Sequence, residues 1–130
     1  MILLDTHTWV WWVQDDPRLT SGHKRVIADN ETLGLGVSAV SCWEVAKLVE
    51  AGRLVLPVDT LEWILKALAY PGVVLIPLTP QIAVQSTRLP GEFHRDPADQ
   101  MIVATARELD IDLVTSDQRI LAYPYVRLVR

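Results

Sequence analysis

The chain has 130 residues, of which 50% are hydrophobic and 22% are charged, and its formal net charge at pH 7 is -4. This length suits a single domain over residues 1–130, and the composition is typical of a globular protein and not of a disordered chain. The negative charge argues against binding nucleic acid by bulk electrostatics. It does not exclude an enzyme that meets phosphate through a metal ion.

No apolar run of the sequence reaches the roughly 18 residues that a membrane span requires, and the first residues do not resemble a signal peptide. The single cysteine, Cys42, excludes an internal disulfide and a cysteine-rich zinc site. We therefore expect a cytoplasmic protein without a membrane partner, in which Cys42 is a small buried hydrophobic residue.

The first half of the chain alternates strand patterns with helical patterns. In chain order we expect a strand, two helices, a second buried strand and a further helix, at residues 2–4, 6–16, 19–30, 32–41 and 41–52. Thr20 or Ser21 would cap the second of these helices. Ser41 would cap the third, with Glu44 three residues later in the position of a capping box.

The second half of the chain continues the alternation. In chain order we expect an extended segment, a helix, a third buried strand, two helices, a fourth strand and a last short strand, at residues 53–59, 59–70, 72–78, 79–90, 96–111, 112–117 and 122–130. Two of these helices open with a capping residue followed by proline, namely Thr79 with Pro80 and Asp96 with Pro97. The alternation predicts an α/β fold with a mostly parallel central sheet flanked by helices.

Four acidic residues are predicted to converge at one edge of this sheet. Asp5 follows the first strand and Asp117 the fourth, and the carboxyl ends of parallel strands meet at the same edge. Glu44 and Asp99 lie one turn into helices, from which each can reach that edge. Such a cluster suits Mg²⁺ or Mn²⁺, which prefer oxygen ligands and leave room for substrate phosphate. Taken singly, each acid is equally well explained as part of a helix cap.

The segments that carry these acids are ILLDTHTW, SAVSCWEVAKL, HRDPADQMIVATAREL and LVTSD, spaced over nearly the whole chain. Together they resemble the PIN-domain ribonucleases, and among them the VapC-like toxins of type II toxin–antitoxin systems. The resemblance implies an α/β/α sandwich and metal-dependent hydrolysis of RNA phosphodiester bonds. It gives metal-binding or catalytic roles to Asp5, Glu44, Asp99 and Asp117. It also implies a toxin homodimer and a cognate antitoxin that inserts a helix into a groove beside the site.

Several neighbours of the acids are candidate supporting residues. Thr115 matches the Thr or Ser that members of this family commonly carry two places before the last acid, and Thr6 and Asp96 are placed with it as supporting residues. His94, Arg95 and Arg119 are candidate RNA contacts, because a guanidinium pairs well with phosphate and a histidine near the cluster can donate a proton. His7 is a further candidate of this kind. Each of these residues has the alternative of an ordinary structural or solvated side chain.

Three tryptophans crowd one short predicted helix, at positions 9, 11 and 12. They cannot all turn toward the core, and an exposed aromatic patch commonly marks a protein interface. We expect this helix to contribute to self-association or antitoxin binding. The alternative is that the three rings form only core and rim.

Two other classes of protein have acids in comparable positions. The segment LLDTHT partly resembles the haloacid-dehalogenase phosphatases, whose nucleophilic Asp is followed two places on by a second Asp, but His7 stands there. A receiver-like signalling domain needs a phosphoacceptor Asp at the end of its third strand, and VVLIPLTP offers none. Both remain alternatives to the ribonuclease.

Overall fold

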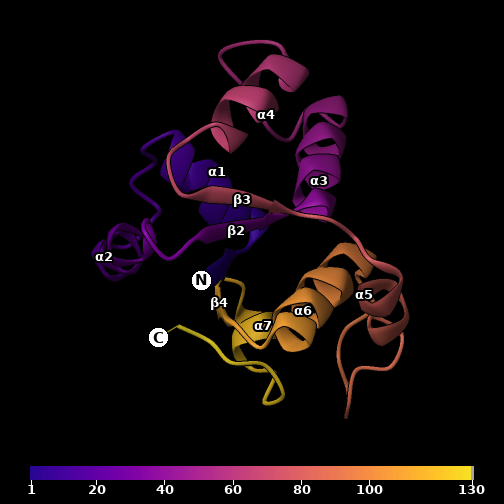
Figure 1. Cartoon of the computed structure of the whole chain (residues 1–130). Helices are drawn as coiled ribbons and strands as arrows, with labels where there is room; N and C mark the ends of the chain where they lie inside the picture. Colours follow the sequence, from indigo (N-terminus) through magenta and orange to yellow (C-terminus); the bar gives the residue numbers. More distant parts are fainter. Residues whose placement is uncertain (130) are drawn as a thin grey trace.

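The computed structural model describes residues 1–129 and is built around a four-stranded sheet (Figure 1). Its strands are β1 (Ile2–Leu4), β2 (Leu35–Ser38), β3 (Val73–Ile76) and β4 (Asp112–Val114), in the order β3-β2-β1-β4. All three pairings are parallel, and Ile2 lies opposite both Leu35 and Asp112. The predicted parallel sheet is therefore confirmed, with β1 in its interior.

Helices cover both faces of the sheet (Figure 1). They are α1 (Thr6–Val13), α2 (Ser21–Asn30), α3 (Ala39–Glu50), α4 (Thr60–Leu68), α5 (Pro80–Gln85), α6 (Pro97–Leu109) and α7 (Gln118–Leu121). Successive residues of a strand point to opposite faces, so Ile2 and Leu4 join the core beneath α1 to α4 while Leu3 joins the core beneath α6 and α7. The fold is the α/β/α sandwich that was expected.

The helix starts follow from short polar caps, with one correction to the predictions. Thr20, not Ser21, caps α2, and Thr79 and Asp96 cap α5 and α6 as predicted. The prediction that Ser41 caps the helix after β2 is wrong, because α3 begins three residues earlier. Ser38, the last residue of β2, caps it by accepting a hydrogen bond of 3.0 Å from the Val40 amide.

Two strand predictions also need correction. β3 is an edge strand and not a buried one, since Val74 and Leu75 are 44% and 49% exposed. The predicted last strand is wrong for residues 122–129, where a single bridge between Leu113 and Leu128 replaces a ladder. Arg130 lies outside the described residues. Within residues 1–129, no helix combines the length and the apolar character that crossing a bilayer requires.

The three tryptophans of α1 have different environments. Trp9 is fully buried and packs edge-on against Trp63, at 5.2 Å between ring centroids. Trp12 is half-buried against Tyr70, at 5.4 Å. Trp11 is half-buried on another side of the helix, beneath the guanidinium of Arg18. Trp9 thus belongs to the core, and the predicted interface role is left to the other two rings.

The cap of α6 gives a first testable prediction. The Asp96 carboxylate accepts a hydrogen bond of 3.0 Å from the Asp99 amide, so Asp96→Ala should lower the free energy of unfolding by about 0.5 to 2 kcal/mol. Chemical denaturation measures this change. Asp96→Asn is the matched control, because it removes the charge and keeps a capping oxygen. Equal losses in the two variants would show that charge, and not capping, explains the effect.

Candidate metal centre

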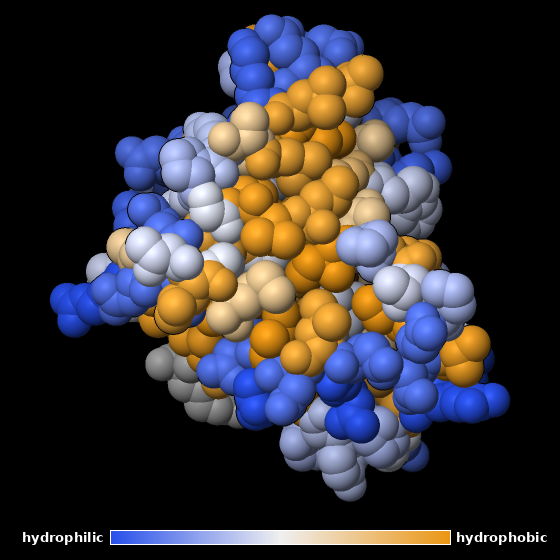
Figure 2. All heavy atoms as spheres, in the orientation of Figure 1, coloured by the Kyte–Doolittle hydropathy of each residue, from blue (hydrophilic) through white to orange (hydrophobic). Residues whose placement is uncertain are grey.

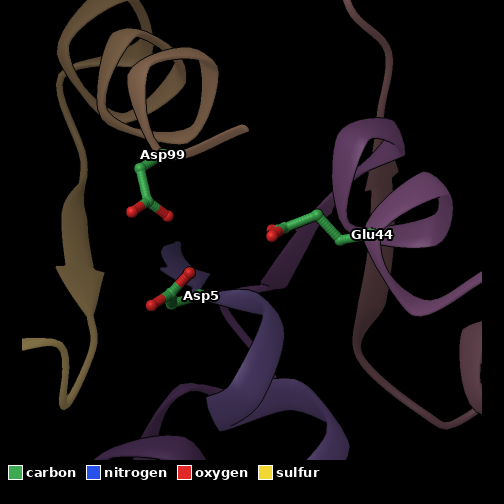
Figure 3. A group of neighbouring side chains, drawn as sticks. All are labelled: Asp5, Glu44 and Asp99. Carbon is green, nitrogen blue, oxygen red and sulfur yellow. The ribbon is translucent and has the colours of Figure 1, made fainter. Parts of the chain in front are cut away.

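Three carboxylates from distant parts of the chain meet at the carboxyl end of β1. Figure 3 shows the side chains of Asp5, Glu44 and Asp99 directed toward a common space from β1, α3 and α6. One oxygen of each lies within 4.8 Å of the others. These three acids converge in the structure as predicted.

Asp5 is the most constrained of the three. It is only 5% exposed, and its two oxygens accept separate hydrogen bonds, of 2.8 Å from the Thr6 amide and of 2.6 Å from the Thr115 hydroxyl. Burial raises the pKa of Asp5, and these two donors act against that rise. Asp5 is therefore the N-cap of α1 and a member of the acidic cluster at once, so the two explanations given for it are not exclusive.

Glu44 reaches the cluster from the second turn of α3 and is held there by hydroxyl groups. The Thr6 hydroxyl donates to Glu44 Oε1 at 2.5 Å and lies 2.8 Å from the Ser41 hydroxyl. Because Thr6 has one hydroxyl proton, Ser41 donates to Thr6 when Thr6 donates to an ionised Glu44. Burial raises the pKa of Glu44 to about 7, with a further contribution from the charges of Asp5 and Asp99. The predicted capping box of Ser41 and Glu44 is absent, and both side chains are hydrogen-bonded to the Thr6 hydroxyl instead.

Asp99 enters the cluster from the first turn of α6. It is 8% exposed, and its Oδ2 lies 2.6 Å from His94 Nε2 and 3.5 Å from Arg119 Nη2. Burial raises the pKa of Asp99, and the contact with His94 opposes that rise. His94 and Arg119, two of the candidate RNA contacts, are thus in contact with the cluster itself.

Asp117 lies beside the three-acid cluster and not within it. Its Oδ1 caps α7 by accepting hydrogen bonds of 2.8 Å from the Arg119 amide and 3.3 Å from the Ile120 amide. Its Oδ2 lies 3.5 Å from Arg119 Nη2, the same nitrogen that approaches Asp99. Partial burial acts to raise the pKa of Asp117, but these amides and the guanidinium outweigh it and the net shift is downward. Three of the four acids therefore form one cluster and Asp117 lies apart from it, with Arg119 in contact with both Asp99 and Asp117.

The other predicted residues have more distant positions. His7 and Arg95 are exposed, and the His7 ring lies 5.9 Å from that of Trp11. Cys42 packs against the core as a small hydrophobic residue, but it is half-buried and not buried as predicted. Ser41 was the residue whose place in the site the sequence did not indicate. Its spacing before Glu44 matched a capping box, and only the packing of α1 against α3 reveals that it faces Thr6.

Comparison with known proteins agrees with this geometry. The family model described as PIN domain matches residues 2–124. The chain is 34% identical over 128 residues to Ribonuclease VapC22 of Mycobacterium tuberculosis, covering 98% of this chain and 95% of that protein. The chain therefore belongs to the PIN-domain family. This membership decides against the phosphatase and receiver-domain alternatives.

Solved structures share the fold at lower identity. DNA-bound VapBC from Salmonella typhimurium matches with a TM-score of 0.74 and 18% identity, covering 99% of this chain and 98% of that one. VapBC2 from Rickettsia felis, bound to a DNA fragment from its promoter, matches with a TM-score of 0.72 and 14% identity, again covering 99% and 98%. At such identities the likeness supports the fold alone.

The raised pKa of Glu44 gives a second prediction. A carboxyl group whose folded pKa of about 7 exceeds its ordinary 4.5 stabilises the fold below pH 4.5, and that contribution is lost as the pH rises to 7. In metal-free protein, Glu44→Gln should therefore be more stable than the wild type above pH 7, by up to about 3 kcal/mol, and should lose this advantage toward pH 4.5.

Denaturation with EDTA at pH 5 and pH 8 measures this difference. The Gln side chain retains an oxygen that can accept from Thr6, so the comparison isolates the charge. Glu108→Gln, at an exposed position of α6, is the control and should follow the wild type at both pH values. Parallel profiles for the wild type and Glu44→Gln would contradict the raised pKa.

Proposed function

We propose that this protein is a metal-dependent ribonuclease and the toxin component of a toxin–antitoxin pair. The observation that carries the proposal is the convergence of Asp5, Glu44 and Asp99 within 4.8 Å at the carboxyl end of a parallel strand. A relative that is named a ribonuclease and is 34% identical over almost the whole chain supports it. We also propose that the protein acts in the cytoplasm, where an RNA substrate is available.

The residues of the cluster fit a divalent cation of the Mg²⁺ or Mn²⁺ type. All their ligand atoms are carboxylate oxygens, and three negative groups buried together are stabilised when a cation lies among them. Asp5, Glu44 and Asp99 would hold the ion. Asp117 would complete the set through its Oδ2, since only its Oδ1 is used in capping α7. A bound divalent ion supplies the chemistry of lowering the pKa of water and offsetting charge on a phosphate.

The surrounding side chains have distinct proposed tasks. Thr115 and Thr6 hold Asp5 and Glu44 in place through hydrogen bonds of 2.6 Å and 2.5 Å. Arg119 Nη2 lies 3.5 Å from both Asp99 and Asp117, but the side chain is 60% exposed, so the other guanidinium nitrogens can pair with an RNA phosphate that approaches these acids. His94 and Arg95 lie on the segment before α6 and would contact the same phosphate backbone from the other side.

A large apolar surface favours a protein partner as well. Figure 2 shows hydrophobic side chains gathered over α4 and β3, and the exposed ones on these elements are Leu61, Leu65, Val74 and Leu75. β3 is an edge strand whose outer side is open to pairing among the described residues. We name this surface the α4–β3 face and propose that it forms the interface of a homodimer. We propose that a cognate antitoxin binds the protein outside this face. Exposed patches of this kind commonly mark interfaces.

The nuclease is tested directly. The wild-type protein should cleave RNA in Mg²⁺ or Mn²⁺, lose the activity in excess EDTA and regain it when metal is restored. Asp99→Asn should reduce the rate by at least about a hundredfold, the scale expected when a preorganised charged group is lost. Its fold should survive, because neutralising Asp99 relieves repulsion within the cluster.

Metal binding has a readout that is independent of cleavage. At an ion concentration about 100 times the dissociation constant, the wild type should gain roughly 3 kcal/mol of stability, seen as a higher melting temperature. Asp29→Asn, at an exposed acid of α2, is the control and should behave as the wild type in both assays. Full cleavage in EDTA, or near wild-type rates for Asp99→Asn, would end the metal proposal.

The proposed dimer is tested on the edge strand. Leu75→Lys places a charge on the α4–β3 face and should convert a dimer into a monomer in analytical ultracentrifugation, with little loss of stability because Leu75 is 49% exposed. Leu109→Lys changes a leucine of similar exposure, 40%, at the end of α6 and should leave the dimer intact. A wild-type protein that stays monomeric, or a Leu75→Lys protein that stays dimeric, would assign the α4–β3 face to another use.

A further inference from the structure

A groove with a volume of about 600 Å³ lies beside the acidic cluster, between α1, the start of α2 and the segment that joins β4 to α7. Its walls include Trp11, Arg18, Thr20, His23, Ser116 and Gln118. Apart from Thr115, none of the acids or their supporting residues lines this groove. We propose that it binds one nucleobase of the RNA substrate, next to the phosphate that is cleaved.

The groove is linked to the acidic cluster through Thr115. Thr115 is one of its lining residues, and the hydroxyl of Thr115 donates to Asp5 Oδ2 at 2.6 Å. Asp117 stands between Ser116 and Gln118, which line the groove on the same segment. An RNA strand whose phosphate reaches the acids from this side places an adjacent nucleotide near this segment. The inference therefore rests on the proposed ribonuclease function and adds a position at which the base is recognised.

Trp11 and Arg18 lie against each other at one wall of the groove. The Arg18 guanidinium lies 5.1 Å from the centre of the Trp11 ring. It is fixed there by Asp16, which accepts hydrogen bonds of 3.1 Å from Nε and 2.8 Å from Nη2, and this pairing lowers the pKa of Asp16 to about 2. Because Asp16 balances the charge of Arg18, the guanidinium is better suited to stacking than to holding a phosphate. Single-stranded RNA bases stack on aromatic rings and on guanidinium planes.

The remaining lining suits the edge of a base. Thr20 and Ser116 present hydroxyl groups, and Gln118 presents an amide with both donors and acceptors. In residues 1–129 the side chains of Ser116 and Gln118 make no hydrogen bond to another described residue. None of the described lining residues is acidic, although the chain has a net charge of -4. The Trp11–Arg18 pair and the free polar groups of Ser116 and Gln118 fit a nucleobase better than a peptide.

The test measures how much one base of the RNA contributes to binding affinity. Affinity for a short labelled RNA in Mg²⁺ is determined in the Asp99→Asn background, and compared with the same RNA carrying an abasic site beside the cleaved bond. Removing the base should weaken binding roughly 5- to 150-fold, the range expected for losing one stacked base. In Trp11→Leu the intact RNA should already bind as weakly as the abasic one, so that removing the base has no further effect.

Two further variants distinguish a loss of base recognition from a loss of folding. Gln118→Ala changes an exposed side chain and should reduce discrimination among the four bases at that position while leaving overall stability unchanged. Trp12→Leu is the matched control on the same helix, because Trp12 packs on Tyr70 outside the groove and should retain full sensitivity to the abasic site.

Each outcome decides the inference. Loss of abasic sensitivity in Trp11→Leu, with Trp12→Leu unaffected, supports it. Equal abasic sensitivity in the Trp11→Leu and Trp12→Leu proteins overturns it. A Trp11→Leu protein that keeps its RNA affinity but no longer binds the antitoxin also overturns it, and would assign the groove to the protein partner. Failure of the nuclease proposal is separate, because it would appear as absent cleavage by the wild type in Mg²⁺ and Mn²⁺.

Discussion

The electrostatic cost of burying Asp5, Glu44 and Asp99 side by side is the constraint on which the rest of the site depends. Three carboxylates within 4.8 Å repel one another, and each is also removed from water, so burial raises the pKa of all three. The fold tolerates this because hydroxyl and amide donors are aimed at the oxygens. Those donors reduce the repulsion without cancelling it, and the remaining negative charge is what would attract a cation.

The same groups that build the fold also build the site, which is why the acids were open to two explanations. Asp5 and Asp117 cap the helices that follow β1 and β4, and each caps with its Oδ1, while Oδ2 of Asp5 accepts from Thr115 and Oδ2 of Asp117 faces Arg119. Strand register then sets their separation, since Leu4 lies opposite Val114 in the ladder. A change in helix start at either position would move a carboxylate as well as a cap.

The sequence predicted the features that arise from local chemistry. The parallel sheet, the caps Thr20, Thr79 and Asp96, and the convergence of Asp5 with Glu44 and Asp99 followed from apolar runs and cap positions. It could not predict features that depend on which elements become neighbours. The exposure of β3 reflects its edge place in the strand order, and the role of Ser41 depends on α1 packing against α3. The separation of Asp117 by Arg119 is likewise a tertiary contact.

The strand order also separates the proposed surfaces from one another. In β3-β2-β1-β4, the acids gather at the carboxyl end of the interior strand β1, the α4–β3 face lies at one edge and the groove lies beyond β4 at the other. Neither Trp11 nor Arg119 belongs to the α4–β3 face, because these residues lie on α1 and α7. We therefore expect RNA to approach the acids from the β4 side of the proposed dimer, without competing with self-association. On this arrangement, we expect an antitoxin that blocks the active site directly to contact the acidic edge itself and not only the α4–β3 face.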